Sequence, residues 1–183
     1  WMEAAGFRQA TVLHGAWAPA AYAEWMGGGE NAPTVLVVGH ADVLPAAPFD
    51  EWSSPPFASA SINGRISGRG SADGKGPIFA AIEAARGLLA SHQGPALTLK
   101  FLIHGEATVG SPNLNALRTA EADRLAADII VVPIPGANVG TGPVVVAGTR
   151  GFLMVTVSVR SSTHDLYAGN FSGAVVNPVD VMA

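Results

Sequence analysis

The chain has 183 residues, of which 49% are hydrophobic and 13% charged, with a formal net charge of −4. This composition excludes an intrinsically disordered chain, and ten lysines and arginines without a basic run argue against partners such as nucleic acid or an anionic membrane. Because cysteine is absent, any bound metal would have to be held by His, Asp and Glu side chains.

The first residues are typical of a helical turn that ends at Gly6. They lack the basic and apolar regions of a signal peptide, and no apolar run reaches the roughly 18 residues needed to cross a membrane. We therefore expect a cytoplasmic protein. A chain that opens inside a helix is also expected to be shortened at its N-terminus.

Short β-branched apolar runs then alternate with Ala-rich stretches, which predicts an α/β fold. The predicted elements are a strand at 34–38, a helix at 77–91, a strand at 97–103, a helix at 114–126 and a strand at 129–132. The strands end near His40, His104 and Pro133. Since ligands bind outside the carboxyl ends of strands in open α/β sheets, we expect the site in these three loops.

The pattern changes beyond these elements. Apolar runs at 143–147 and 152–159 are separated by a short Gly-Thr-Arg-Gly string, and the second run alternates like an antiparallel strand with one exposed face. We expect one domain over residues 1–149. Residues 150–183 would form the incomplete start of a second domain, with this strand and a helix from about Ala174.

A histidine and a carboxylate follow the first predicted strand directly, as His40 and Asp42. A histidine whose second ring nitrogen is held by a carboxylate is the usual arrangement around a metal ligand. On spacing alone, however, such a pair at a strand end is more often an ordinary turn. The pair therefore needs support from the rest of the sequence.

Two further strings provide that support: Trp-Ser-Ser-Pro-Pro-Phe at 52–57 and Gly-Arg-Gly-Ser-Ala-Asp-Gly-Lys-Gly at 68–76. Together with the string around His40, they resemble the signature of the zinc-dependent metallopeptidases and amidohydrolases that include carnosinase, aminoacylase, bacterial dipeptidases and succinyl-diaminopimelate desuccinylase. The resemblance extends to the strings at 148–151, 165–169 and 173–178. It implies a three-layer α/β/α catalytic domain followed by the beginning of an inserted lid and dimerisation domain.

The resemblance also implies roles for three residues of the first two strings. In the family, the position of His40 binds one zinc, that of Asp42 orients this histidine, and that of Asp73 bridges two zinc ions. A bridging carboxylate offsets the repulsion between two cations about 3.5–4 Å apart. His40 and Asp73 are thus the implied metal ligands.

The third motif departs from the family, which has Glu-Gly-x-Glu-Glu-x-Gly-Ser where this chain has His-Gly-Glu-Ala-Thr-Val-Gly-Ser at 104–111. Ala107 stands where the family has the glutamate that deprotonates the attacking water, and Thr108 stands where it has a zinc ligand. Alanine cannot accept a proton, and threonine is a poor zinc ligand. His104 and Glu106 remain as weak alternative ligands, although Glu106 is one position out of register.

Later positions depart in the same sense. Ile134 replaces an acidic metal ligand, and Tyr167 replaces a lid histidine that stabilises the oxyanion in the neighbouring subunit. Tyr167 and Arg150 are candidates for substrate binding, although a surface ion pair is the more common fate of an arginine such as Arg150. The family's last ligand would lie beyond Ala183, so we expect a shortened product or a piece of a longer chain.

Three functions remain open. The favoured one is an impaired or inactive hydrolase that holds one zinc weakly or none. It would act by binding a dipeptide or other small molecule, as a homodimer through the lid domain, or with an active paralogue. The second is an active hydrolase of dipeptides or N-acyl amino acids in which His104 and Glu106 take over the ligand and base roles. The third is a structural fragment without a ligand.

Overall fold

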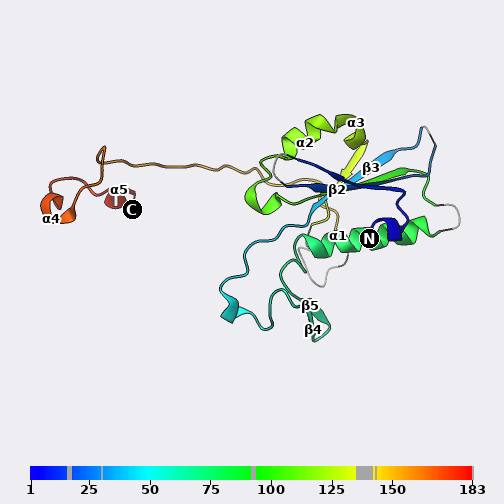
Figure 1. The fold of residues 1–183 in the computed structure, drawn as a ribbon, viewed down its shortest axis with the longest axis horizontal. Helices are drawn as coiled ribbons and strands as arrows, with labels where there is room; N and C mark the ends of the chain where they lie inside the picture. Colours follow the sequence, from blue (N-terminus) through cyan, green and yellow to red (C-terminus); the bar gives the residue numbers. More distant parts are fainter. Residues whose placement is uncertain (16–17, 30, 92–93, 135–141, 143, 183) are drawn as a thin grey trace. The chain divides into compact units, whose positions relative to one another are not determined.

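The computed structural model describes residues 1–15, 18–29, 31–91, 94–134, 142 and 144–182 (Figure 1). The chain forms two compact units, Trp1–Val144 and Val145–Ala183, which are described separately below. Their correspondence to a catalytic domain over 1–149 and a lid domain over 150–183 stays a prediction.

A five-stranded mixed sheet forms the centre of the first unit, with strand order β1-β2-β6-β3-β7. β3 runs parallel to both β6 and β7, whereas β2 runs antiparallel to β1 and β6. The strands are β1 Gln9–Leu13, β2 Ala20–Met26, β3 Thr34–His40, β6 Thr98–His104 and β7 Ile129–Val131. A separate hairpin pairs β4 Ala60–Ile62 with β5 Arg65–Ser67.

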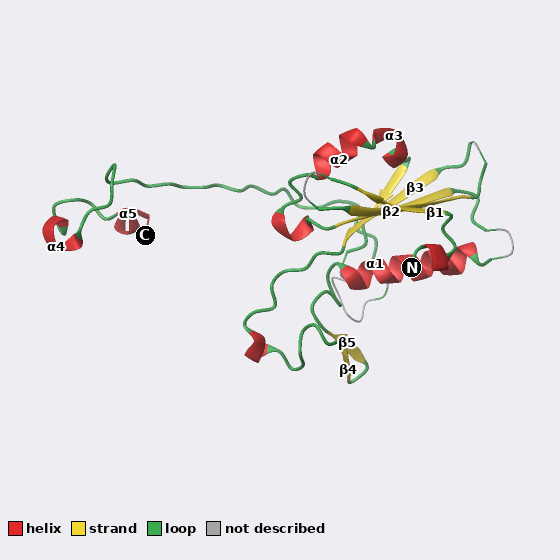
Figure 2. Ribbon diagram, viewed as in Figure 1, coloured by secondary structure: helices red, strands yellow, loops and turns green. Residues whose placement is uncertain are grey.

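Helices cover both faces of the five-stranded sheet, α1 on one side and α2 with α3 on the other (Figure 2). The helices of the chain are η1 Glu3–Ala5, η2 Phe49–Glu51, α1 Lys75–Leu89, η3 Ala107–Val109, α2 Leu114–Ala120, α3 Ala122–Leu125, α4 Ala168–Phe171 and α5 Pro178–Met182. None of the helices in the described ranges is long and apolar enough to cross a membrane.

Two apolar clusters, one on each face of the sheet, hold these layers together. On the α1 side the cluster includes Val37 and Phe101, and on the α2 and α3 side it includes Leu36 and Leu102. Successive residues of a strand point to opposite faces, so β3 and β6 each supply both clusters. This explains why residues 35–38 of β3 and 101–103 of β6 are apolar in succession instead of alternating with polar residues.

The predicted α/β class and most elements of the first unit are confirmed. The strands expected at 34–38, 97–103 and 129–132 are β3, β6 and β7, and the helix expected at 77–91 is α1. The single helix expected over 114–126 is wrong, because the chain leaves helical geometry at Glu121 (φ −111°, ψ 27°) and divides into α2 and α3.

The strand predicted at 152–159 is also wrong. These residues form no strand, and nearly all of them are exposed. A strand needs a hydrogen-bonded neighbour, and the described part of the second unit supplies none. Residues 144–147 are likewise without strand structure, and position 143 lies outside the described residues. The helix expected from about Ala174 is present only as α5.

Two hairpins were not predicted. The β1–β2 pair was missed because β2 contains three alanines, which are weak strand formers, although its Ala23 is completely buried. The β4–β5 pair carries a recognisable signal, since Asn63 and Gly64 both have positive φ, as a two-residue type I′ turn requires.

Candidate functional site

The loops that follow β3 and β6 meet at the carboxyl edge of the sheet. His40 and His104, the last residues of these parallel strands, are register partners, and their ring centroids are 6.4 Å apart. The backbone N–H of Ala41 donates to the carbonyl of His104 at 2.9 Å. Two of the three strand ends named from the sequence, those at His40 and His104, are therefore neighbours in space.

His40 lies between two carboxylates. Its Nδ1 is 3.3 Å from Oδ1 of Asp42 and 3.0 Å from the backbone carbonyl oxygen of Asp42, and its Nε2 is 3.5 Å from Oδ1 of Asp73. The two carboxylates differ in exposure, since the side chain of Asp42 is 17% exposed and that of Asp73 is 69% exposed. The structure thus brings together the three residues that match the family pattern.

Gly74, at the start of α1, allows this approach to His40. Its φ is +81°, and a Cβ atom at this position would lie 2.9 Å from Cε1 and 3.2 Å from Nδ1 of His40. The ammonium group of Lys75 then donates to the carbonyl of Ala41 at 2.7 Å. The Asp-Gly-Lys string therefore holds the helix start against the loop that carries His40.

Asp42 is fixed by the loop that follows β6. Its carboxylate accepts hydrogen bonds from the N–H of Ala107 at 3.1 Å, the N–H of Thr108 at 2.7 Å and the hydroxyl of Thr108 at 2.6 Å. Burial alone would raise the pKa of Asp42, but these hydrogen bonds lower it to about 2. The residues at the base and ligand positions of the third motif therefore serve as donors to Asp42.

Glu106 points to a different part of the molecule. Its carboxylate accepts hydrogen bonds from the N–H of Asn113 at 3.0 Å, the N–H of Ala18 at 3.0 Å and the side-chain amide of Asn113 at 3.2 Å. These bonds, led by that from the Asn113 backbone, lower its pKa in spite of burial. Glu106 thus joins the start of α2 to the chain before β2.

His104 is buried beside Glu106. Its Nδ1 has no hydrogen-bond partner among the described residues. Burial lowers the pKa of His104, and the nearby His40 adds to this effect, whereas Asp42 and Glu106 oppose it. His104 and Glu106 line a cavity of about 10 Å³ that His40 and Asp73 do not line.

A larger cavity, of about 420 Å³, lies in front of His40. His40, Asp42, Asp73 and Thr108 line it, together with Trp52 and residues 43–44 and 65–72. The guanidinium group of Arg69 lies 4.8 Å from the ring centre of Trp52 and donates to the carbonyl of Pro45 at 3.0 Å. The two family strings at 52–57 and 68–76 therefore meet at one wall of this cavity.

Of the remaining predicted residues, Ile134 belongs to the first unit and is not among those that line this cavity. Ile134 follows β7 in the first unit and is 51% exposed. Arg150 and Tyr167 belong to the second unit, where both are exposed. Their roles in substrate binding stay predictions.

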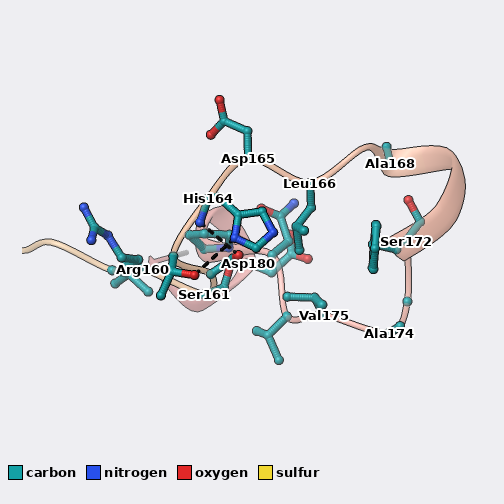
Figure 3. Close-up of a pocket in the computed structure, with 18 residues that line it drawn as sticks. Arg160, Ser161, His164, Asp165, Leu166, Ala168, Ser172, Ala174, Val175 and Asp180 are labelled. Carbon is teal, nitrogen blue, oxygen red and sulfur yellow. Dashed lines mark hydrogen bonds between the residues drawn. The ribbon is translucent and has the colours of Figure 1, made fainter.

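The second unit has a hollow of its own, of about 940 Å³, formed by residues 159–180 (Figure 3). It is lined by short helices and loops whose side chains are mostly exposed, so it is an open concavity and not a gap in a packed core. His164, one of its polar residues, has its Nδ1 3.2 Å from the hydroxyl of Thr163. Residues of the strings at 165–169 and 173–178 contribute to this hollow, whereas the strings around His40, Trp52 and Asp73 surround the cavity of the first unit.

The family model for "Peptidase family M20/M25/M40" matches residues 36–179. The chain belongs to this family. This confirms the resemblance that the strings around His40, Trp52 and Asp73 carry.

Individual M20 relatives agree with this assignment. The chain is 33% identical over 156 residues to the Beta-Ala-His dipeptidase of Mus musculus, covering 84% of this chain and 32% of the relative. It is 35% identical over 136 residues to the succinyl-diaminopimelate desuccinylase of Burkholderia lata, covering 72% and 35%. The M20 family metallo-carboxypeptidase Sso-CP2 of Sulfolobus solfataricus superposes with a TM-score of 0.66 at 32% identity, covering 72% and 30%. The chain thus spans about a third of the length of the curated relatives it matches.

The donors that the described residues place around His40 do not by themselves make up a zinc site. In the described ranges, no group of three or more His, Cys, Asp or Glu side chains is placed to hold a metal ion. His40 and Asp73 supply two donors, whereas zinc in proteins takes at least three protein ligands. The Asp42 carboxylate is occupied by its three hydrogen bonds. We therefore derive no chemical step through a metal.

Proposed function

We propose that this M20-family chain does not hydrolyse peptide or amide bonds by the two-metal chemistry of its family. One observation carries the proposal: Ala107 and Thr108, at the positions of the base and of a metal ligand, donate hydrogen bonds to Asp42 and present no carboxylate to the cavity. Loss of a general base alone lowers a rate by about 10² to 10⁴. Loss of a ligand weakens metal binding in addition.

The cavity in front of His40 is the part of the site that the substitutions leave usable. Its volume of about 420 Å³ lies in the range of small-molecule sites, and its wall combines apolar side chains with the His40 and Asp73 pair. Since the relatives named above include a dipeptidase, we propose that the cavity binds a dipeptide or an N-acyl amino acid without cleaving it.

The alternative of a rewired hydrolase, in which Glu106 is the base and His104 a ligand, has less support. Both oxygens of Glu106 already accept hydrogen bonds from Ala18 and Asn113, and neither Glu106 nor His104 lines the cavity of His40. A base has to reach the water that it activates.

The proposal is tested by metal analysis and turnover assays on the purified chain. We expect less than about 0.2 equivalents of zinc per chain and no cleavage of a panel of dipeptides and N-acyl amino acids. Turnover that disappears in Glu106→Gln, in a variant that keeps the Tm of the unmutated chain, would establish the rewired hydrolase. One tightly bound zinc per chain, or turnover that survives Glu106→Gln, would also contradict the proposal.

Chain length has to be separated from the substitutions. For this purpose, Ala and Thr are placed at the positions of Ala107 and Thr108 in a full-length family member that has the glutamate pair. We expect its kcat/KM to fall by at least about 10² to 10⁴ and its zinc content to decrease. Retained activity in this variant would show that the two substitutions do not abolish catalysis.

A further inference from the structure

Three loops of the site are joined by direct contacts between side chains and backbone. His40 ends β3 and Asp42 lies in the loop that follows it, the segment before α1 carries Asp73, and the loop after β6 carries Thr108. His40 contacts Asp73 through Nε2, and the Asp42 carboxylate accepts hydrogen bonds from both the N–H and the hydroxyl of Thr108. Residues 42 and 108 are 66 positions apart in sequence, so this bond is a genuine tertiary link.

We propose that Thr108 is a positioning residue that ties the β6 loop to the β3 loop in place of a metal ion, so that the site keeps its shape without metal. The position that supplies a metal ligand in the family here supplies two donors to a carboxylate. An ion would join these loops by coordinating one group from each, whereas the Asp42–Thr108 pair joins two of them directly. His40, held against Asp42, extends the link to Asp73.

The chemistry of the pair suits this role. A hydrogen bond from a hydroxyl to a carboxylate is charge-assisted and short, as the 2.6 Å distance from Thr108 Oγ1 to Asp42 illustrates. Asp42 is mostly buried and has three donors, so its charge is satisfied without a cation. A glutamate in place of Thr108 would remove the hydroxyl donor and set a second carboxylate beside Asp42, where the two like charges would oppose each other's ionisation.

The rest of the β6 loop is held independently of Thr108. Glu106 binds Ala18 and Asn113, and its backbone carbonyl accepts the N–H of Ser111 at 2.8 Å. A side-chain change at position 108 therefore removes the hydroxyl bond to Asp42, which is the shortest of the three, and leaves the two backbone bonds to Asp42 and the other attachments of the loop in place. This makes the link separable by mutation.

The test compares Thr108→Val, which keeps the shape but cannot donate from its side chain, with Thr108→Ser, which restores the hydroxyl. Thr119→Val is the matched control, because the hydroxyl of Thr119 is exposed and bonds only within α2. We expect Tm to fall by about 3–10 °C in Thr108→Val and to change little in Thr108→Ser and in the control. In Thr108→Val, amide exchange at residue 108 should accelerate by about tenfold or more.

A double-mutant cycle with Asp42→Asn isolates the pair, since Thr108→Val should have little further effect once Asp42 is replaced. For the unmutated chain, EDTA and added zinc should leave Tm unchanged. An unchanged Tm in Thr108→Val, additive effects in the cycle, or a Tm that rises with zinc and falls with EDTA would each overturn the inference. If Thr108→Val leaves Tm unchanged while the chain binds no zinc and shows no turnover, the inference about Thr108 is wrong and the proposed function stands. The two proposals are therefore tested separately.

Discussion

Replacement of Asp42 by asparagine should destabilise the chain by an amount that depends on pH. The native carboxylate accepts three hydrogen bonds, and its pKa is lowered from 3.8 to about 2. Each pKa unit corresponds to about 1.4 kcal/mol, so the ionised form of Asp42 contributes about 2 kcal/mol to folding at neutral pH. In Asp42→Asn, the amide nitrogen faces at least one of these donors, and the contribution is lost.

The sign of the pH effect follows from the direction of the shift. Because the native pKa lies below the unfolded value, the unfolded chain takes up this proton first as the pH falls. The stabilisation from Asp42 is therefore complete above about pH 5 and disappears as the pH falls from about 4 toward 2. The stability difference between the unmutated chain and Asp42→Asn should shrink over the same interval.

Urea unfolding followed by circular dichroism at pH 7, 5, 4 and 3 measures this difference. Asp50→Asn is the control, since Asp50 is an exposed carboxylate of η2 and its replacement should change the free energy of unfolding by less than about 0.5 kcal/mol. A deficit in Asp42→Asn of less than about 0.5 kcal/mol at pH 7, or one that stays constant down to pH 3, would refute the role assigned to the Asp42 hydrogen bonds.

Two further substitutions test the packing around the site. In thermal unfolding, Gly74→Ala should lower the free energy of unfolding by about 1 kcal/mol more than Gly64→Ala. Both positions have positive φ, but only a Cβ atom at position 74 would meet His40. Equal losses in the two variants would show that this contact is unimportant. In urea unfolding, Phe101→Ala should lower the free energy of unfolding by about 3–5 kcal/mol, because the Phe101 side chain is 1% exposed in the core between α1 and the sheet. Ile130→Ala should lower it by less than about 1 kcal/mol, because Ile130 is 63% exposed. Similar losses at both positions would contradict the assigned core.

Much of the first unit could be predicted because its signals are local. β3 and β6 contain the consecutive apolar residues 35–38 and 101–103 because each strand supplies both clusters of the core, and Pro77 lies in the first turn of α1. The β2 strand was not predicted because alanine is a weak strand former. Its alanines are in a strand because β2 pairs with β1 on one side and β6 on the other. The strand predicted at 152–159 failed for the converse reason, since its alternation has no described partner to pair with.

The candidate site divides in the same way. The family and the position of His40 at a strand end could be inferred from the order of residues alone, and so could the presence of Ala107 and Thr108 where the resemblance leads one to expect two glutamates. The partners of these residues follow from the folded arrangement: Thr108 donates to Asp42, and Glu106 accepts hydrogen bonds from Ala18 and Asn113. These partners come from segments far apart in the chain, and the parallel pairing of β3 with β6 brings the two loops together. A residue's type limits which bonds it can form, and the fold determines which partner it meets.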